Sequence, residues 1–411
     1  MQPVFAILPF LVAAAAAIDP AATDSSDPKL ASSTSQFALD LYGALRDRDG
    51  NVFCSPLSIT TALAMTAAGA RGETAEQMNR TLHLDRLGPS GLADLGRWID
   101  SLRGTIKARA DAEEPKPNEP AAGLWMANAV WIDAREKLQP DFVALVDQSF
   151  RAEARAVDFA HSADAARRTI NRWVEDQTRD KIKDLLKPSL ITSDTVVVLT
   201  SAIYFKGYWT HPFSVEATRD DDFHPAKGDV VRVKMMNQTA SLPYFEGDSF
   251  QALELPYKDG SLAMVVLLPR RADGLGALEA SLSVEKLDSW LAGLKPGRVK
   301  ASLPRFTSTV ETELNDVLKK LGMPLAFQGG ADFSGITGSP DFAISAVVHK
   351  AFVEVEEKGT EAAAATAVVG VRSSVMIPSK EIVFRADHPF LYLIRDVKTG
   401  AILFMGRLSR P

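Results

Sequence analysis

The side chains best suited to chemistry in this chain are six histidines, one acidic run and one glycine-rich segment. The histidines are His83, His161, His211, His224, His349 and His388. No two of them have the spacing of a zinc-binding HExxH motif. The nucleophile elbow GxSxG, the P-loop and the GxGxxG motif are absent as well. A hydrolase built from scattered Ser, His and Asp residues stays conceivable, but no motif favours one.

The remaining candidates have simpler interpretations. Asp220, Asp221 and Asp222 form a charge run that is typical of a solvated turn rather than a metal site. The segment "QGGADFSGITG" lacks the lysine of a phosphate-binding loop, so we expect a surface loop. His349 lies in the apolar stretch "AISAVVHKAFVEVEE", which favours a buried, hydrogen-bonded histidine over a titrating switch.

Length and composition set the frame for these residues. The chain has 411 residues, of which 46% are hydrophobic and 24% charged, as in an ordinary globular protein. At about 150 residues per domain this length suggests two or three domains, yet no repeat or shift in composition marks a boundary. The net charge of −6 argues against nucleic acid or an anionic membrane as a partner. Cys54 is the only cysteine, so no internal disulfide forms, and its apolar neighbours predict a buried thiol.

The N-terminus has the features of a secretory signal. An apolar run extends from Pro3 to Ile18, too short for a comfortable membrane span. We therefore expect a signal peptide over residues 1–18 and a secreted or periplasmic protein, although no Lys or Arg precedes the run. Residues 19–33 are expected to form a flexible lead-in. The alternative is a frayed apolar N-terminus.

The order of elements predicts an α+β fold. Phe37, Leu41 and Leu45 recur with helical spacing, and "SPLSITTALAMTAAGA" has the cap and early proline of a helix. Strands dominate the second half, where "FQALELPY" and "GSLAMVVLLP" flank an Asp-Gly turn. Helices followed by strands and long hairpins indicate packing around antiparallel sheets.

The stretch "VEEKGTEAAAATAVVGVRSS", residues 355–374, does not fit this pattern. Its alanines favour a short helix over residues 360–368. The stretch nevertheless lies between two segments that are typical of strands.

Several ordered motifs together resemble the serpin family. They are "NVFCSPLSITTALAMTAAGARGETAEQM", "NRWVEDQTRDKIKDLL", "SAIYFKGYW", "FQALELPYKDGSLAMVVLLP", "LPRFTSTVETELNDVLKKLGM", "VVHKAFVEVEEKGTEAAAAT" and "ADHPFLYLIRDVKTGAILFMGRL". The resemblance covers residues 34–410. It implies one serpin domain over residues 34–411, with three mainly antiparallel sheets, eight or nine helices and an exposed reactive-centre loop at about residues 357–380.

The resemblance also implies an activity. A serpin of the inhibitory type is a suicide substrate of serine proteases, and cysteine proteases are a further target class. The protease cleaves the loop and forms an acyl-enzyme, and the loop then inserts as a strand into the main sheet. A monomer that can form loop–sheet polymers is expected, with no cofactor. "LRGTIKARADAEEPKP" has too few cations for a heparin-type site. The alternative is a non-inhibitory serpin that binds or carries another molecule.

The stretch 355–374 meets the demands of insertion. Alternate residues of a strand share a face, so Thr360, Ala362, Ala364 and Thr366 form an inward row of small side chains. Glu361, Ala363 and Ala365 form the opposite row, where charge can stay in solvent. No proline interrupts the ladder, and Gly359 provides a backbone pivot. We expect Glu356, Glu357 and Lys358 to keep this pivot exposed.

The bait bond follows from counting along the loop. Typical inhibitors of the family place it between Ser373 and Ser374. Arg372 is an alternative of nearly equal rank that suits a trypsin-like protease, and Val375 or Met376 would suit elastase- or chymotrypsin-like targets.

The resemblance assigns further residues to conformational control of the sheet. These are Asn51, Ser55, Pro56, Ser58, Ser201, Trp209 and His349. Ser201 departs from the Asn that is usual in the family, and its shorter side chain has one hydroxyl in place of an amide. The latch on sheet opening is therefore expected to differ. Trp209 matches the aromatic where the loop first enters, and plain core packing is its simpler role.

Overall fold

The computed structural model describes residues 28–88, 90–112, 122–258, 260–340, 342–360 and 381–411. Within these ranges the α-helices are α1 (Pro28–Leu45), α2 (Pro56–Gly69), α3 (Gly72–Thr81), α4 (Gly91–Ala112), α5 (Pro140–Phe150), α6 (Phe159–Gln177), α7 (Leu275–Ala280), α8 (Val284–Ala292), α9 (Asn315–Leu321) and the single turn α10 (Ser334–Thr337). The described helices are thus one or two more than the resemblance implies. The first, α1, includes residues 28–33 of the expected lead-in.

The main sheet has six strands in the order β10-β11-β12-β4-β2-β3. Their bounds are β2 (Gly123–Asp133), β3 (Glu153–Val157), β4 (Val197–Tyr208), β10 (Phe306–Glu313), β11 (Ile344–Glu356) and β12 (Gly359–Thr360). The short β12 separates β11 from β4 at one end only. Along the rest of their length β11 and β4 pair directly, in parallel.

The other nine strands form a second hydrogen-bonded sheet, in the order β1-β15-β14-β8-β7-β6-β9-β13 with β5 beside β6. Their bounds are β1 (Val52–Cys54), β5 (Ser214–Phe223), β6 (Val231–Glu246), β7 (Phe250–Pro256), β8 (Leu262–Pro269), β9 (Lys295–Pro304), β13 (Ile382–Arg385), β14 (Phe390–Asp396) and β15 (Ile402–Leu408). The long strand β6 pairs with both β9 and β7. Through β6, two of the three sheets that the resemblance implies are connected here as one continuous hydrogen-bonded sheet.

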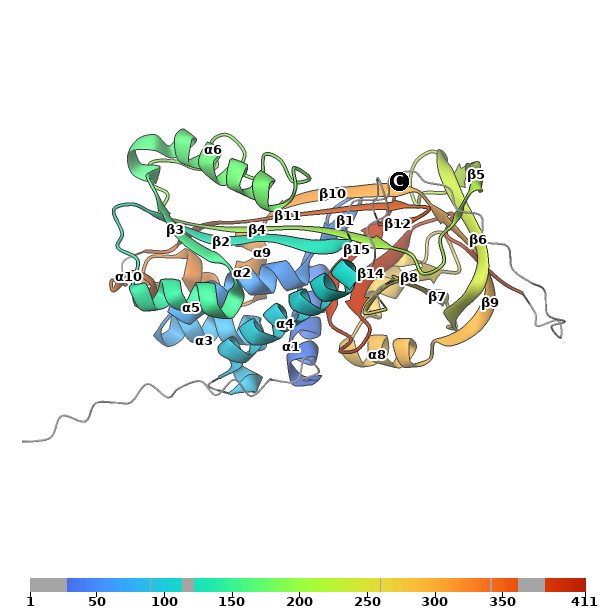
Figure 1. Cartoon of the computed structure of the whole chain (residues 1–411), viewed down its shortest axis with the longest axis horizontal. Coiled ribbons are helices and arrows are strands. Elements are labelled where there is room, and N and C mark those ends of the chain that lie inside the picture. The colour runs from blue at the N-terminus through green and yellow to red at the C-terminus, as the bar shows by residue number, and fades with distance from the viewer. Residues whose placement is uncertain (1–27, 89, 113–121, 259, 341, 361–380) are drawn as a thin grey trace, which may run out of the picture.

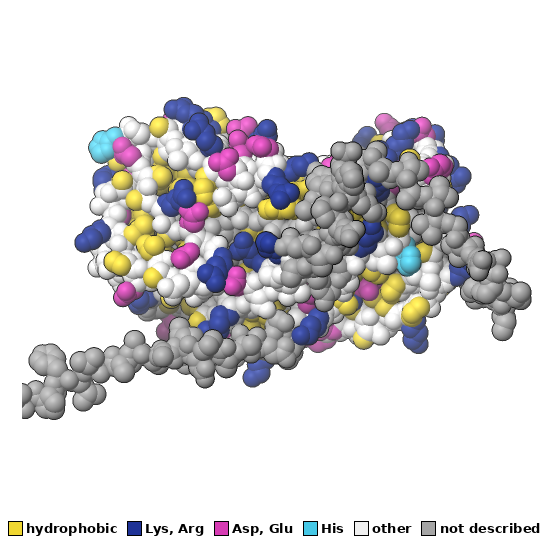
Figure 2. Space-filling view, in the orientation of Figure 1, with side chains coloured by type: hydrophobic (Ala, Val, Ile, Leu, Met, Phe, Trp, Pro, Cys, Tyr) yellow, Lys and Arg dark blue, Asp and Glu magenta, His cyan; other side chains and the backbone are white. Residues whose placement is uncertain are grey.

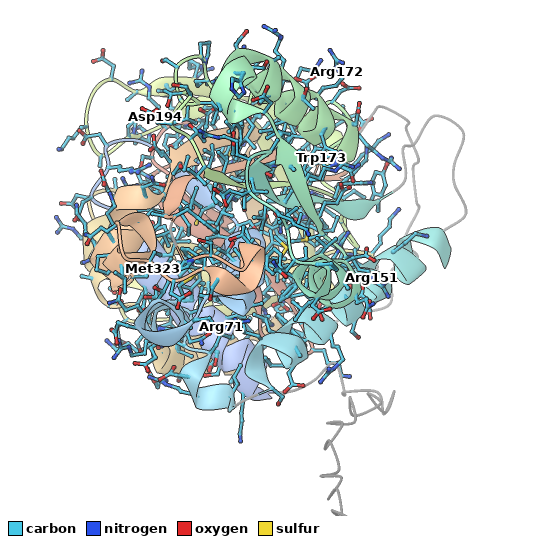
Figure 3. The ribbon with its side chains drawn as sticks, turned by 90° about the vertical axis from the view of Figure 1, so that its left-hand side faces the viewer. Arg71, Arg151, Arg172, Trp173, Asp194 and Met323 are labelled. Carbon is cyan, nitrogen blue, oxygen red and sulfur yellow. The ribbon has the colours of Figure 1, made fainter. Side chains whose placement is uncertain are left out.

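Both faces of the main sheet are covered around its central strand β4. All of β4 is buried, as expected for a strand with packed layers on both sides. Figure 1 shows α6 over one face and α2 under the other. Trp173 of α6 meets Trp131 of β2 edge to face, with ring centroids 5.2 Å apart, and Figure 3 shows Trp173 between α6 and the sheet.

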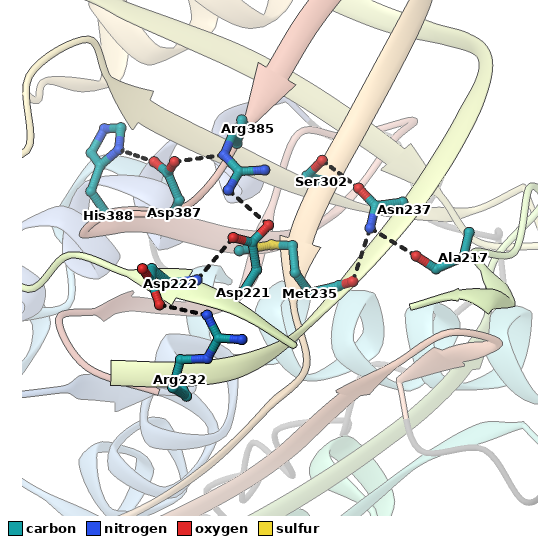
Figure 4. Close-up of polar contacts among 10 residues, drawn as sticks. All are labelled: Ala217, Asp221, Asp222, Arg232, Met235, Asn237, Ser302, Arg385, Asp387 and His388. Carbon is teal, nitrogen blue, oxygen red and sulfur yellow. Dashed lines mark hydrogen bonds and ion pairs between the residues drawn. The ribbon is translucent and has the colours of Figure 1, made fainter. Parts of the chain in front are cut away.

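Two local predictions are corrected by the fold. The acidic run is part of β5 rather than a turn, and each carboxylate meets a cation of another strand, either β6 or β13 (Figure 4 draws two of the three pairs). The pairs are Asp220 with Lys234, Asp221 with Arg385 and Asp222 with Arg232. The segment "QGGADFSGITG" is also not a plain surface loop, since Phe333 and Ile336 are fully buried. In both cases long-range packing outweighs local composition.

Candidate functional site

The short strand β12 lies between β11 and β4 and contains the predicted pivot Gly359. We call this strand and the residues just before it the hinge. Thr360 pairs with Val355 on one side and Gly207 on the other. Its side chain is fully buried, and its hydroxyl oxygen lies 2.7 Å from the Tyr257 hydroxyl oxygen. A small polar side chain therefore fits this position, in agreement with the inward row predicted for Thr360.

Position 359 needs a glycine because β4 lies very close to it, and not because of its backbone conformation. A Cβ atom at this position would lie 2.0 Å from the Gly207 carbonyl oxygen and 2.7 Å from the Tyr208 Cα. Such contacts are far shorter than any real Cβ makes, so a side chain would force β12 away from β4.

The expectation that charged residues keep this pivot exposed is wrong. Glu357 is only 3% exposed. Arg305 donates to its two carboxylate oxygens at 2.6 and 2.8 Å, and the Thr218 hydroxyl donates at 2.8 Å. Burial alone would raise the pKa of Glu357, but these hydrogen bonds outweigh burial and lower it. The hinge is thus anchored by an ion pair between the buried Glu357 carboxylate and the partly exposed Arg305 guanidinium.

Trp209 joins the hinge to the core. Its backbone N–H donates to the Lys358 carbonyl at 2.8 Å, and its indole N–H donates to the Glu356 carbonyl at 2.9 Å. Its ring stacks on Tyr257 with centroids 4.6 Å apart. The residue therefore serves core packing and also contacts the hinge directly.

A second polar group lies farther along the same strand boundary, where β11 and β4 pair. His349 of β11 is opposite Ser201 of β4, which is opposite Asn128 of β2. Ser55 and Ser58 approach from α2, where Ser55 is the N-cap residue. We call these five residues the strand-boundary cluster. All of them are buried.

Hydrogen-bond directions in the strand-boundary cluster follow from one fixed donor. The backbone N–H of Ser55 must donate to His349 Nε2, 3.0 Å away, so Nε2 carries no proton. The proton on Nδ1 is then shared between the carbonyl and hydroxyl oxygens of Ser201, at 2.9 and 3.0 Å. The Ser201 hydroxyl donates to Ser58 Oγ at 2.9 Å, and the Ser58 hydroxyl donates to Asn128 Oδ1 at 2.7 Å. One directed chain therefore ties α2, β2, β4 and β11 together.

The strand-boundary cluster needs a neutral histidine. Burial lowers the pKa of His349 to about 3, and the hydrogen bond to the Ser201 carbonyl offsets only part of this shift. A second proton would sit on Nε2 and oppose the Ser55 N–H. This agrees with the predicted structural role of His349.

Asn128 is the residue that sequence reasoning missed. It lies in "LWMANAVWID", where it is the only polar side chain inside an apolar stretch that ends at Asp133, and that isolation is the signal that could have drawn attention. Its Nδ2 also donates to the Ser58 carbonyl at 3.2 Å. Asn128 thus supplies an amide directly beside the position where Ser201 has only a hydroxyl.

Three predicted control residues lie outside the strand-boundary cluster: Trp209, which contacts the hinge, Asn51 and Pro56. Asn51 holds the C-terminal segment instead: its Nδ2 donates to the Arg410 carbonyl at 2.7 Å, and its Oδ1 accepts from the Ser409 N–H at 2.7 Å. Pro56 occupies the first turn of α2, buried and next to the cap.

The rest of the predicted loop lies outside the described residues. This applies to Glu361, Ala362, Ala363, Ala364, Ala365 and Thr366, and to the bait candidates Arg372, Ser373 and Ser374. Within the described part of the chain, no group of three or more His, Cys, Asp or Glu side chains could hold a metal ion. No helix among the described residues is long and apolar enough to cross a membrane.

Comparisons with known proteins identify the family. Residues 32–411 match the family model described as "Serpin (serine protease inhibitor)". The chain is 40% identical over 391 residues to the leukocyte elastase inhibitor of Xenopus tropicalis, covering 93% of this chain and 99% of that protein. It is 39% identical over 388 residues to an uncharacterized serpin-like protein of Thermococcus kodakarensis, covering 94% and 87%. The crystal structure of human thyroxine-binding globulin in complex with its ligand has a TM-score of 0.80 and 29% identity, covering 93% and 98%. This chain belongs to the serpin family.

Proposed function

We propose that this serpin is a suicide-substrate inhibitor of serine proteases, with cysteine proteases as a further target class. The observation that carries the proposal is the position of β12. Gly359 and Thr360 already lie between β11 and β4, and Thr360 is buried. These two residues therefore form the first part of the position that a longer inserted strand would occupy.

The register of β12 indicates where the next residues would go. Each step forward along an antiparallel strand is one step back along its partners. Thr366, six residues after Thr360, would then come opposite Ser201 and His349, which lie six residues before Gly207 and Val355. Its hydroxyl could replace the bond between Ser201 and His349 that must break when the strands part. The strand-boundary cluster is therefore suited to accept an inserted strand without leaving polar groups unpaired.

The covalent step proposed for the loop is ordinary acyl transfer. The hydroxyl of the protease's serine attacks the carbonyl carbon of Ser373, or of Arg372. The peptide bond to the next residue breaks, the departing amine takes up the proton that the serine loses, and an ester joins the two proteins. Insertion of the loop then carries the acylated protease away before water can hydrolyse the ester.

The test is to mix the full chain with trypsin-, elastase- and subtilisin-type proteases and to analyse the products on a denaturing gel. A band near the summed mass of both proteins is expected for at least one protease. Mass spectrometry of the released C-terminal peptide would identify the bait bond. Cleavage without any such band across the whole panel would contradict the proposal.

The panel also separates the alternative functions. A structurally similar relative, thyroxine-binding globulin, was crystallised with a bound small molecule. Cleavage that never leads to a covalent complex would favour such a binding or carrier role. Turnover of a small ester that one Ser substitution abolishes would instead favour a hydrolase.

We also propose that the protein is exported and acts as a monomer. The apolar run from Pro3 to Ile18 motivates export, although residues 1–27 lie outside the described part. An N-terminus of the mature protein that begins near residue 19 would support this, and an intact Met1 would contradict it. Size-exclusion chromatography with light scattering checks the monomer, and polymers that appear on mild heating would indicate insertion of the loop into a second copy.

A further inference from the structure

The strand that follows the expected reactive-centre loop is short and lies at the edge of its sheet. β13 has four residues, and among the described strands it pairs only with β9, in parallel. Just beyond it, the Ala386 N–H donates to the Ser302 carbonyl at 2.9 Å. A parallel pairing of this length contributes few hydrogen bonds. Side-chain contacts must therefore do much to hold β13 on the sheet.

A series of polar contacts starts at the last residue of β13. Arg385 donates through Nε to Asp387 Oδ2 at 2.7 Å and through Nη2 to Asp221 Oδ2 of β5 at 2.8 Å. The other oxygen of Asp387, Oδ1, lies 2.8 Å from His388 Nδ1, and His388 Nε2 lies 2.6 Å from the Pro269 carbonyl oxygen at the end of β8. Figure 4 shows the part from His388 to Asp221. We call these five residues the β13 anchor, because they tie β13 to β5 and β8.

Both ring nitrogens of His388 face oxygen atoms that can only accept hydrogen bonds. The Pro269 carbonyl has no proton to donate. Burial alone would raise the pKa of Asp387, but hydrogen bonds from His388 and Arg385 outweigh burial and lower it, so this carboxylate is ionised.

This arrangement favours the charged form of the ring. A neutral imidazole has one N–H, so its other nitrogen would direct a lone pair at an oxygen 2.6 or 2.8 Å away. An imidazolium ion donates to both oxygens. Burial alone would lower the pKa of His388, but the contacts with Asp387 and the Pro269 carbonyl outweigh burial and raise it.

The charges of the β13 anchor balance only when His388 is protonated. Two cations, His388 and Arg385, then face two carboxylates, Asp387 and Asp221. Loss of the proton leaves an excess of one negative charge in a half-buried group.

The other groups around the ring are committed elsewhere. Arg270 follows Pro269 in the chain, but its guanidinium pairs with Glu246 of β6. The His224 N–H donates to the Asp387 carbonyl at 2.7 Å, while the His224 residue itself is exposed. Asp387 is therefore the charged group in direct contact with the ring.

The charges on β5 and β6 are also paired. Arg219 acts on Asp221 from a distance and helps to lower the pKa of that carboxyl, whose largest cause is the hydrogen bond from Arg385. Asp220 and Asp222 form the ion pairs with β6 described above. Figure 2 shows acidic and basic side chains side by side at the end of the molecule that β5 and β6 form.

We propose that the β13 anchor is proton-dependent: the charged His388 ring holds β13 on its sheet, and the neutral ring lets the strand separate. A neutral ring can keep its hydrogen bond to Asp387 or its hydrogen bond to the Pro269 carbonyl, but not both. The protein would then hold the C-terminal end of its loop firmly below the folded pKa of His388 and loosely above it.

The end of the loop that β13 holds is the end nearest the bait candidates, since Ser374 lies eight residues before Ile382. A loop that is held there loses less conformational freedom when a protease binds it. The anchor concerns strands of the described fold, and only this effect on proteases rests on the proposed function.

The test is hydrogen exchange of the full chain between pH 6 and pH 9, measured by mass spectrometry on peptides from residues 381–389. Protection factors, which are corrected for the intrinsic pH dependence of exchange, should fall by about fivefold or more over this range, as expected for the loss of one hydrogen bond. A peptide from β2, on the other sheet, is the reference and should keep its protection. A nuclear magnetic resonance titration of the His388 ring should give a midpoint above the ordinary histidine value of about 6.5.

Variants separate the charge of the ring from its packing. His388→Lys carries a charge across the whole pH range and should keep β13 protected throughout. His388→Gln has no charge and should show the low protection of the neutral ring at every pH. Asp387→Asn removes the carboxylate that attracts the proton, so the midpoint should move to lower pH. The matched control is His224→Gln, at an exposed histidine, which should retain the pH dependence of the parent protein. Thermal unfolding confirms that each variant is folded.

Three results would overturn the proposal. The first is unchanged protection of residues 381–389 between pH 6 and pH 9. The second is the full pH dependence in folded His388→Gln, which would assign it to another group. The third is an equal loss of protection in the β2 peptide, which would report unfolding of the whole protein. None of these measurements depends on a protease, so a failure of the anchor and a failure of the proposed inhibition are distinguishable.

Discussion

The two ends of the boundary between β11 and β4 are built differently. At the hinge, β12 already separates the strands. The contacts there are backbone hydrogen bonds, the close approach of Gly359 to the Gly207 carbonyl, and the ion pair of the buried Glu357 with Arg305. At the strand-boundary cluster the strands touch, and directed side-chain hydrogen bonds close them. In the proposed mechanism, the sheet would therefore open from the end where β12 already separates the strands, and the side-chain hydrogen bonds of the strand-boundary cluster would oppose opening at the other end.

Under the proposed insertion mechanism, this difference indicates which side chains an inserting strand would need. Near the hinge it must be small, because there is no room beside Gly207. At the strand-boundary cluster it must be polar, because separation of Ser201 and His349 leaves buried donors and acceptors unpaired. The predicted inward row consists of small residues and has threonine at positions 360 and 366. It would therefore meet the need for a small side chain near the hinge and for a polar side chain at the strand-boundary cluster.

The largest expected effect comes from cleavage of the loop. An inserted strand would add about ten backbone hydrogen bonds, each worth about 1 kcal/mol net. At about 2 °C per kcal/mol for a chain of this size, the melting temperature should rise by about 20 °C. Differential scanning calorimetry before and after limited proteolysis measures this, and equal melting temperatures would contradict insertion from the hinge end.

Thr360→Arg tests the hinge end directly. A buried arginine without a partner costs several kcal/mol, so the variant should be cleaved at the normal rate but fail to form the covalent complex. Thr360→Ser is the matched control and should trap like the parent protein. Trapping by the arginine variant would show that the inward row is assigned to the wrong face.

Acid should weaken the strand-boundary cluster and leave the hinge intact. The folded pKa of His349 is about 3, below its unfolded value near 6.5. Between these values the unfolded state binds the extra proton, so stability falls as the pH falls below 6.5, by about 2 kcal/mol at pH 5. Urea unfolding across this pH range measures the loss, which His349→Gln should largely remove.

His388 serves as an internal comparison, because its pKa is shifted in the opposite direction to that of His349. Burial lowers its pKa, but its hydrogen bonds with Asp387 at 2.8 Å and with the Pro269 carbonyl at 2.6 Å outweigh burial and raise it (Figure 4 shows the Asp387 contact). Its contribution is therefore present at low pH and is lost as the pH rises through the folded pKa. If His388→Gln rather than His349→Gln removed the acid sensitivity, the interpretation of the strand-boundary cluster would be wrong.

Ser201→Ala should loosen the closed end by a smaller amount. The variant removes one of the two acceptors of His349 Nδ1, since the Ser201 carbonyl remains, and it removes the donor to Ser58, at a cost of about 1–2 kcal/mol. Combined with Ser58→Ala, the loss should be smaller than the sum of the two single losses, because both belong to one hydrogen-bond chain. Full additivity in urea unfolding would contradict that chain.

Lys181→Ala should give the smallest effect. Its Nζ lies 5.6 Å from the ring centroid of Phe352 on β11 and 6.0 Å from that of Tyr204 on β4, so it bridges the two strands that must part. Loss of these cation–π contacts should reduce the free energy that holds the two strands together by about 0.5–1 kcal/mol, and complex formation should become two- to fivefold faster. Lys183→Ala, at a nearby exposed lysine, should leave the stopped-flow rate unchanged.

Much of the strand-boundary cluster could be predicted before the fold, and the reasons for the omissions are physical. Ser55 was recognisable because a helix cap has a local pattern, and His349 because one polar residue interrupts an apolar strand. Asn128 went unnoticed, since its role depends on its place opposite Ser201, and strand register is not a local property. Glu357 was misplaced for a similar reason: its partner Arg305 is distant in sequence.

The sequence alone determined the family, the α+β class and the buried, hydrogen-bonded character of His349, and it predicts the row of small residues that begins at Thr360, because spacing and side-chain size act locally. Only the tertiary structure decided that an ion pair anchors the hinge, and that the Gly207 carbonyl leaves no room for a side chain at position 359. It also decided that Asn128 lies opposite Ser201 on the neighbouring strand. These facts depend on which segments the fold brings together, and close packing of distant segments can bury a charge that local composition would leave in water.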